Sequence, residues 1–427
     1  MNFIRVRLGV LGLALLTGFT VPTAASAAEA APSPTVEEQR LDRAVPREIL
    51  RRSGFDTVAP RLARALDEAR SYAQARRIVA HQGAQLWRRA VDRAQGRGPA
   101  EYEGREALRW KGGGGRRAGL SRDDDRPLYW ARLGMTREVR AWEPEFGLTA
   151  GQRAALLDEL ERNSRGQTAL RYPHGKSLKR ILVTGFDPFT LDRDIRISNP
   201  SGATALALDG TVIDTADGPA RIEAVVFPVR WRDFTEGTVE RTLRPYLPKV
   251  DLFTTVSQGR VGRFDVERTN GAWRGGFADN DNIGRTETVP VTDPASQPQW
   301  TTTTLPYRAI VAADTGRFPV YDNTAVTEIP AGGGTEPVVR PEGPTPGSTA
   351  RAGGGGDYLS NEIAYRATLL RDRLGLHDVL PGGHVHTPVL QFGAGNTTEV
   401  TDPEFVRNRL DIITQVRTIL RVTAEES

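Results

Sequence analysis

Hydrophobic residues follow a helical spacing from about residue 45 to residue 170. They recur three and four positions apart, with Arg, Asp and Glu between them, as at Leu62, Leu66 and Ala69. Such spacing places one side of each helix in a core. Thr149 and Gln152 have the arrangement of a capping box, which marks a helix start. The pattern therefore predicts an all-helical region over residues 45–175.

From residue 180 onward, short hydrophobic runs alternate with helical runs. Strands followed in turn by helices are typical of a parallel or mostly parallel sheet covered on both faces. We therefore expect an α/β domain over residues 176–427, built as a three-layer α/β/α sandwich whose sites form at the carboxyl ends of the strands. The expected strands are 181–183, 222–229, 251–256 and 385–390, and the expected helices are 200–208, 237–247, 360–374 and 403–423.

A glycine run opens the helix expected at 360–374. Residues 354–361 read Gly-Gly-Gly-Asp-Tyr-Leu-Ser-Asn. A helix start carries unpaired N–H groups and the positive end of the dipole, which suits a nucleophile such as Ser360 and the oxyanion it creates. Serine is also a common helix cap, so a capping role alone is the alternative. The preceding Gly- and Pro-rich insertion, 331–356, is expected to be a long surface loop that could act as a lid.

The N-terminus has the pattern of a secretory signal peptide over residues 1–27. Arg5 and Arg7 precede a hydrophobic run at 8–21, and Ala25-Ser26-Ala27 forms a cleavage site. The run is short for a membrane span, so no stable membrane anchor is expected. Residues 28–44 look like a loose spacer. We expect a secreted, extracellular protein.

Composition narrows the chemistry further. The 427 residues contain no cysteine, which excludes disulfides, thiolate metal sites and a cysteine nucleophile. The formal net charge is only +4, because 57 basic residues face 53 acidic ones. No nucleic-acid partner is expected from so weak a balance. A peptide or small-molecule partner is expected instead, and a homo-oligomer remains open.

Several short motifs follow one another between residues 185 and 388. The first is Gly-Phe-Asp-Pro-Phe at 185–189, followed by Asn-Pro-Ser at 199–201. Gln258-Gly259 with Val-Glu-Arg at 266–268 comes next, and then Thr-Thr-Leu-Pro at 303–306. The run ending in Ser360 and His386-Thr387-Pro388 complete the series. In this order the motifs resemble those of the pyroglutamyl peptidase I (pyrrolidone carboxylate peptidase) family, in which the last two correspond to the nucleophile motif and the His-x-Pro motif.

The resemblance covers residues 180–425 and implies a catalytic triad and a substrate pocket. The triad would be Glu267, Ser360 and His386, with serine where the family has cysteine. A serine hydroxyl needs a base during attack, which would be His386 oriented by Glu267. The resemblance also implies that Phe186, Phe189 and Gln258 bind substrate, the two aromatic rings lining a pocket for the lactam ring of an N-terminal pyroglutamate. No metal or organic cofactor is implied.

Glu267, His386 and the two phenylalanines also have alternative interpretations, and for Phe186 and Phe189 the alternative is a position in the core. Glu267 beside Arg268 could be a solvated strand carboxylate, and His386 could be a hydrogen-bonded core histidine. His384 and His386 lie two positions apart and so project from one face of a strand. Together with Glu267 or an Asp they could therefore hold Zn²⁺.

The sequence as a whole predicts a secreted hydrolase of the pyroglutamyl peptidase type. Ser360 would attack the carbonyl that joins pyroglutamate to the next residue, and His386 would transfer the proton. Two alternatives stay open. One is a non-catalytic binding protein that keeps the fold and pocket, and the other is a serine-dependent esterase or amidase for another acyl group.

Overall fold

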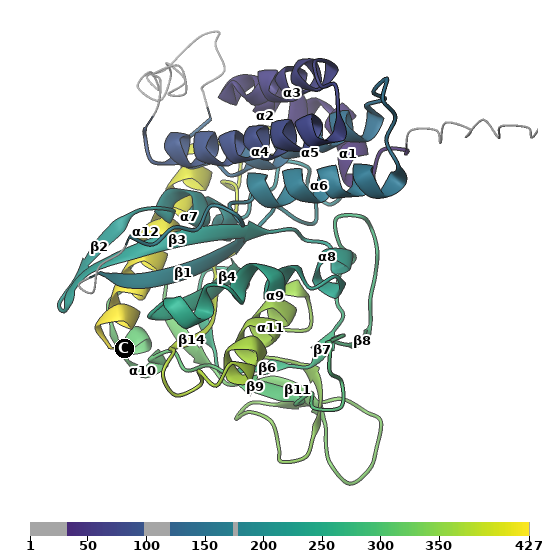
Figure 1. Ribbon diagram of the computed structural model, residues 1–427. Coiled ribbons are helices and arrows are strands. Elements are labelled where there is room, and N and C mark those ends of the chain that lie inside the picture. The colour runs from purple at the N-terminus through teal and green to yellow at the C-terminus, as the bar shows by residue number, and fades with distance from the viewer. Residues whose placement is uncertain (1–31, 98–119, 174–177, 427) are drawn as a thin grey trace, which may run out of the picture. The chain divides into compact units, whose positions relative to one another are not determined.

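The computed structural model describes residues 32–97, 120–173 and 178–426. The expected signal peptide lies outside the described residues. Helices come first, and a seven-stranded sheet follows (Figure 1). This order confirms the predicted fold class, an N-terminal helical region followed by a mostly parallel α/β fold.

The N-terminal region is helical, as predicted. Thr149 caps α6 through the predicted capping box with Gln152. The prediction of a loose spacer over 28–44 is wrong from Thr35 onward, because Thr35 and Glu38 form a second capping box that opens α1. The helices are α1 Val36–Gln39, α2 Ala44–Ser53, α3 Val58–Asp67, α4 Tyr72–Ala94, α5 Arg126–Ala141 and α6 Ala150–Ser164, with 3-10 turns at Arg40–Asp42 and Phe55–Thr57.

The large sheet has the strand order β10-β5-β14-β4-β1-β3-β2. Its four central strands, β14, β4, β1 and β3, are parallel, whereas β5 runs antiparallel to β14, and β2 runs antiparallel to β3. The outer strands β10, β5 and β2 are short, and the hydrophobic pattern of the sequence did not predict them. The seven strands are β1 Lys179–Phe186, β2 Val212–Thr215, β3 Gly218–Phe227, β4 Leu252–Gln258, β5 Phe264–Glu267, β10 Val320–Asn323 and β14 Gly382–Thr387.

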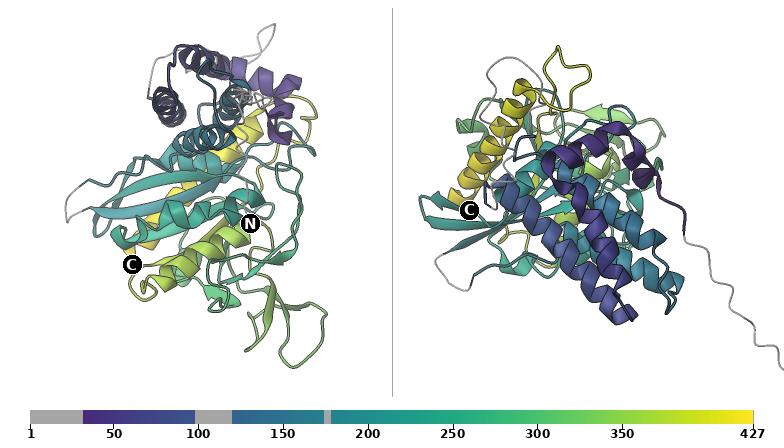
Figure 2. Two further views of the ribbon diagram at one scale, coloured as in Figure 1. Left: turned by 45° about the vertical axis from the view of Figure 1, so that its right-hand side comes forward. Right: turned by 90° about the horizontal axis from the view of Figure 1, so that it is seen from above.

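Helices cover both faces of this sheet. Leu182 contributes to the core beneath α9 and α11, whereas its neighbours Ile181 and Val183 contribute to the core shared with α7, α12 and the N-terminal helices. Helix α4 contacts α7. The N-terminal helices, drawn in purple and blue in Figures 1 and 2, therefore lie on the face of the sheet that α7 covers. The helices of this part are α7 Pro200–Leu208, α8 Trp231–Thr235, α9 Thr238–Leu243, α10 Tyr307–Ala312, α11 Leu359–Arg373 and α12 Pro403–Glu425, with a 3-10 turn at Leu247–Lys249.

The stretch at 331–356 differs from the predicted surface loop. It supplies two strands of a three-stranded antiparallel sheet, β12-β11-β13. Fully buried Glu328 accepts hydrogen bonds from the Thr345 backbone and hydroxyl and from Arg340, which ties the segment to β11. The small strands are β6 Thr269–Gly271, β7 Trp273–Arg274, β8 Glu287–Thr288, β9 Trp300–Thr302, β11 Val326–Ile329, β12 Val338–Arg340 and β13 Thr349–Ala352.

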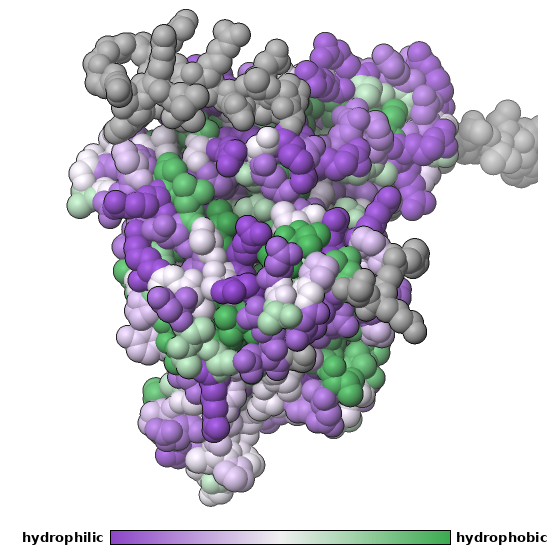
Figure 3. All heavy atoms as spheres, turned by 90° about the vertical axis from the view of Figure 1, so that its left-hand side faces the viewer, coloured by the Kyte–Doolittle hydropathy of each residue, from purple (hydrophilic) through white to green (hydrophobic). Residues whose placement is uncertain are grey.

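The surface is rich in charged side chains. On the face shown in Figure 3, hydrophobic residues form small groups among hydrophilic ones. Among the described residues, no helix combines the length and the hydrophobicity needed to cross a membrane.

Candidate active site

Glu267 and His386 form a buried pair on adjacent strands. Glu267 ends β5, His386 lies in β14, and these strands are antiparallel neighbours. The Oε1 atom of Glu267 lies 2.8 Å from Nδ1 of His386, and its Oε2 accepts a hydrogen bond of 2.7 Å from Asn323 Nδ2. The Glu267 side chain is fully buried, so the solvated-carboxylate alternative is wrong. Both of its oxygens are held, which fixes the carboxylate against the imidazole ring.

Ser360 lies in the first turn of α11 and is not its cap. The helix begins at Leu359, its N-cap is Tyr358, and no side chain makes a capping hydrogen bond. The Ser360 hydroxyl instead donates to the Gly355 carbonyl oxygen at 3.4 Å. Among the described residues, the Ser360 hydroxyl makes only this hydrogen bond. Ser360 and His386 are therefore not hydrogen-bonded to each other.

The glycine run passes directly over the Glu267–His386 pair. A Cβ atom at Gly355 would lie 2.3 Å from Cε1 of His386, and one at Gly354 would lie 2.2 Å from Oε2 of Glu267. No side chain fits at such distances, so the close approach requires glycine at both positions. The backbone of Gly354 and Gly355 thus covers the imidazole and the carboxylate. The run is part of the site rather than a passive linker.

A small cavity adjoins Ser360. Its volume is about 30 Å³, which is room for one or two water molecules. The three residues expected to bind substrate all line it together with Ser360, so the structure brings them to one place. The lining residues are Phe186, Phe189, Asn199, Val229, Ser257, Gln258, Tyr358, Leu359 and Ser360.

Tyr358 forms the centre of an aromatic cluster at this cavity. Its ring centroid lies 5.9 Å from that of Phe189, 5.2 Å from that of Trp231 and 5.7 Å from that of Phe277. Its hydroxyl donates to the Ala278 carbonyl at 3.2 Å. Phe277 is 64% exposed, so the cluster extends from the cavity to the surface. The spacing of these residues along the sequence did not indicate such a cluster.

His384 is fully buried, and both of its ring nitrogens have hydroxyl partners. Nδ1 lies 2.7 Å from Thr255 Oγ1 and Nε2 lies 2.8 Å from Ser257 Oγ. Because the Thr255 hydroxyl donates to the Gly383 carbonyl, it must accept from Nδ1–H, and Ser257 must then donate to Nε2. These bonds use both nitrogens of His384 and argue against the Zn²⁺ alternative. No cluster of three or more His, Asp and Glu side chains suited to a metal occurs within 32–97, 120–173 and 178–426.

Stability should depend on pH through His384. Burial, with repulsion from His386, lowers the pKa of His384 well below its ordinary 6.5. Below pH 6.5 the unfolded chain binds a proton that the folded chain excludes, so the His384 contribution to stability falls by about 1.4 kcal/mol per pH unit until the folded pKa is reached. Urea denaturation of the wild type and His384→Gln between pH 7.5 and 5 measures this, and the stability difference between them should change by that slope. Parallel curves would contradict it.

Three polar residues of the site were not foreseen. Asn323 holds Glu267, and Ser257 holds His384 beside the cavity. Asn361 bonds through its amide to the backbone of Gly271 and Trp273, which fixes the start of α11. Asn361 stands next to Ser360 in the quoted motif and could have been noticed there. Asn323 lies on an edge strand that no hydrophobic pattern marks.

Comparison with known proteins gives two family-level matches. The model described as PA0049 N-terminal domain matches residues 20–161, and that described as PA0049, C-terminal domain matches residues 180–293 and 317–391. The uncharacterized protein PA0049 of Pseudomonas aeruginosa is 33% identical over 502 aligned positions, which cover 90% of this chain and 88% of that protein.

Solved structures with similarity to the chain include two peptidases. A mutant pyrrolidone carboxyl peptidase from Pyrococcus furiosus is 23% identical, with a TM-score of 0.39, over 58% of this chain and 99% of that chain. Pyroglutamyl peptidase I from Bacillus amyloliquefaciens is 21% identical, with a TM-score of 0.39, over 58% of this chain and 98% of that one.

Proposed function

The chain belongs to the PA0049 family, and we propose that it is a secreted hydrolase that removes pyroglutamate, or a related acyl group, from the N-terminus of peptides. The observation that carries the proposal is the buried Glu267–His386 hydrogen bond beside the first turn of the Ser360 helix. The ordered motifs at 185–189 and 386–388 support the substrate class. The leader-like residues 1–27 support secretion.

The chemistry we propose is acyl transfer in two steps. Glu267 accepts from Nδ1–H of His386, which leaves Nε2 as the basic nitrogen. His386 takes the Ser360 proton as Oγ attacks the acyl carbonyl, and it then protonates the leaving amine. Water, deprotonated by the same nitrogen, next attacks the acyl-enzyme and releases the acid and free Ser360. N–H groups in the first turn of α11 would stabilise the oxyanion.

Attack requires a local change at the glycine run. Ser360 must exchange its contact with the Gly355 carbonyl for one with His386 Nε2, and the Gly355 backbone lies against the His386 ring. Glycine allows backbone conformations that other residues rarely adopt, so the run can supply this change. In the proposed enzyme, Ser360 exchanges the Gly355 carbonyl for His386 when the substrate binds.

The same contact favours a second candidate, a binding protein without catalysis. With Ser360 bonded to Gly355 instead of His386, the triad lacks its serine–histidine hydrogen bond. The cavity and its aromatic cluster could still recognise the lactam ring of pyroglutamate. A serine-dependent esterase or amidase acting on another acyl group is chemically related to the first proposal and needs the same triad.

A fluorogenic pyroglutamyl amide tests the proposal. The mature wild-type protein should release the fluorophore, and Ser360→Ala should not, because the alanine side chain offers no nucleophile. If the two release equal amounts while the wild type still binds the pyroglutamyl group, the binding protein is the better description. Labelling of Ser360 by a covalent serine probe, without turnover of pyroglutamyl substrates, would favour the esterase or amidase.

A further inference from the structure

Two arginines of the helical region reach the loop that lines the cavity. This loop, called the pocket loop, comprises residues 187–199 and connects β1 with α7. Its first residue, Asp187, follows Phe186 and is only 3% exposed. Its Oδ2 accepts hydrogen bonds from Nε and Nη2 of Arg165 at 3.1 and 2.9 Å, and it lies 2.6 Å from Nη2 of Arg132. Arg132 is in α5, and Arg165 directly follows α6. One carboxylate oxygen of the pocket loop is thus held from two helices of the N-terminal region.

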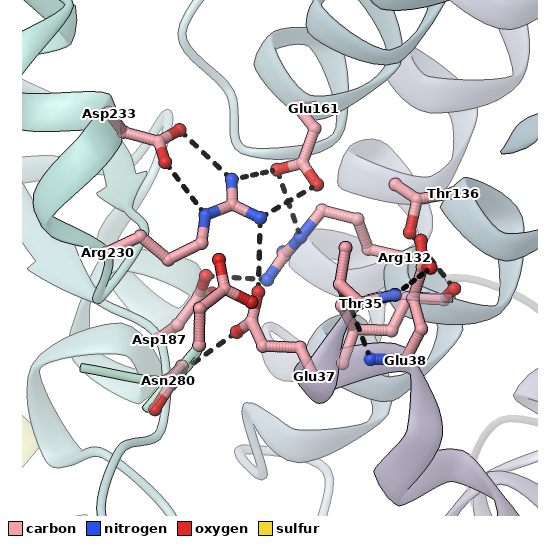
Figure 4. Close-up of polar contacts among 12 residues, drawn as sticks. Thr35, Glu37, Glu38, Arg132, Thr136, Glu161, Asp187, Arg230, Asp233 and Asn280 are labelled. Carbon is pink, nitrogen blue, oxygen red and sulfur yellow. Dashed lines mark hydrogen bonds and ion pairs between the residues drawn. The ribbon is translucent and has the colours of Figure 1, made fainter. Parts of the chain in front are cut away.

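These contacts belong to a larger buried network, and Figure 4 shows the part of it around Arg132 and Arg230. Glu161 of α6 pairs with Arg132, Arg165 and Arg230. Arg230, just before α8, also pairs with Asp233 at 2.8 Å and with Glu37 of α1 at 3.1 Å. The network therefore connects the helical region with the α/β region through charged groups that have little contact with water.

A second connection joins the helical region to the pocket loop through Asn280. Asn280 Nδ2 donates to Glu37 at 3.0 Å and to the Pro188 carbonyl at 2.9 Å, and Arg40 donates to the Asn280 carbonyl at 2.5 Å. Pro188 lies in the pocket loop. Asn280 lies three residues after Phe277 of the aromatic cluster. Helix α1 and the adjoining turn thus hold the pocket loop and the segment that carries Phe277, whose ring packs against Tyr358 of the cavity lining.

Buried charges make this arrangement sensitive to the loss of a single member. A buried arginine or carboxylate that loses its partner keeps the full cost of its removal from water, which destabilises the segment that carries it. Asp187 is the member on the pocket loop. Its backbone is held in addition by hydrogen bonds from its N–H to Phe227 O and from Asn199 Nδ2 to its carbonyl.

We propose that the N-terminal helical region is part of the substrate site, with Arg132 and Arg165 as positioning residues that hold Asp187 and keep Phe186 and Phe189 against the cavity. This assigns a role to the region that the peptidase resemblance does not cover. The effect on substrate rests on the proposed function, whereas the effect on the loop does not.

The test compares full-length Arg132→Met and Arg165→Met with Arg93→Met. Arg93 is a similarly buried arginine, in α4, but its hydrogen bonds go to carbonyls at 120–124 within the helical region. Arg93→Met therefore controls for general loss of stability. Asp187→Asn, which keeps the side-chain volume, serves as a second probe if an arginine variant does not fold. Hydrogen exchange of the amides at 184–192 is measured by mass spectrometry, together with KM and kcat on the pyroglutamyl amide.

Arg132→Met, Arg165→Met and Asp187→Asn should each speed exchange at 184–192 and raise KM about tenfold, with kcat changed by less than about threefold, because the altered loop binds substrate and transition state alike. Arg93→Met should leave both unchanged. Exchange at 184–192 that is unaltered, or altered equally by Arg93→Met, would overturn the proposal. Absence of wild-type turnover would refute the proposed function alone, since exchange still reports the loop.

Discussion

Replacing His386 by alanine is expected to lower kcat/KM for a pyroglutamyl amide by about a thousandfold or more. The variant lacks the base that accepts the Ser360 proton and the acid that protonates the leaving amine, and loss of either function in a triad costs at least that much. KM should change little, because His386 is not among the residues that line the cavity. Initial rates over a range of substrate concentrations separate the two parameters.

Glu267→Gln is the matched variant for this prediction. Glutamine has the size of glutamate and keeps the contact with Asn323 available, but it lacks the negative charge that stabilises the imidazolium. Its kcat should fall by about a hundredfold or more with the fold intact, as judged by circular dichroism. Wild-type rates in His386→Ala would show that the buried pair has no part in catalysis.

Ser360→Cys is expected to create a reactive thiol and thiol-sensitive pyroglutamyl hydrolysis. A cysteine in the first turn of α11 would lie at the positive end of a 15-residue helix and near His386, two conditions that lower a thiol pKa. The thiolate would attack without needing a base at the moment of reaction. Alkylation rates between pH 5 and 9 give its pKa, which should fall about one unit or more below the ordinary 8.5.

The chain is suited to this measurement because it has no native cysteine to compete for the reagent. Ser71→Cys, at the exposed start of α4 and outside the cavity lining, serves as the control for an accessible thiol at a helix start without His386 nearby. A well-folded Ser360→Cys protein with an ordinary thiol pKa and no hydrolysis would contradict the assignment of Ser360 as the nucleophile position.

The sequence predicted the parts of the site that lie on strongly patterned elements. The hydrophobic runs located the central strands, and helix 200–208 was predicted at its observed bounds. The ordered motifs indicated Glu267 and His386, although 119 positions separate them. The motifs alone indicated this pair, because β5 runs antiparallel to β14 and the carboxyl ends of two antiparallel strands lie at opposite edges of a sheet.

The remaining features depend on long-range contacts that no local pattern records. Asn323 reaches Glu267 only because the edge strand β10 pairs with β5 in one register. The insertion was expected to be a loop because its composition is rich in Gly and Pro, but glycines such as Gly332 and Gly333 adopt positive φ in the connection between β11 and β12. Composition does not distinguish such turns from irregular loops. The spacing of residues along the sequence likewise did not predict the ion pairs of Asp187 with Arg132 and Arg165.

The small volume of the cavity has a consequence for affinity. A space of about 30 Å³ admits one or two waters, so the lactam ring is fully enclosed only in a conformation in which Tyr358 or its neighbours have moved. The measured dissociation constant is then the intrinsic one divided by the fraction of molecules already open. If about one molecule in a hundred is open, binding is about a hundredfold weaker than the contacts alone would give. Substitutions that change only the fraction of open molecules would therefore alter affinity, even at positions that do not contact the ligand.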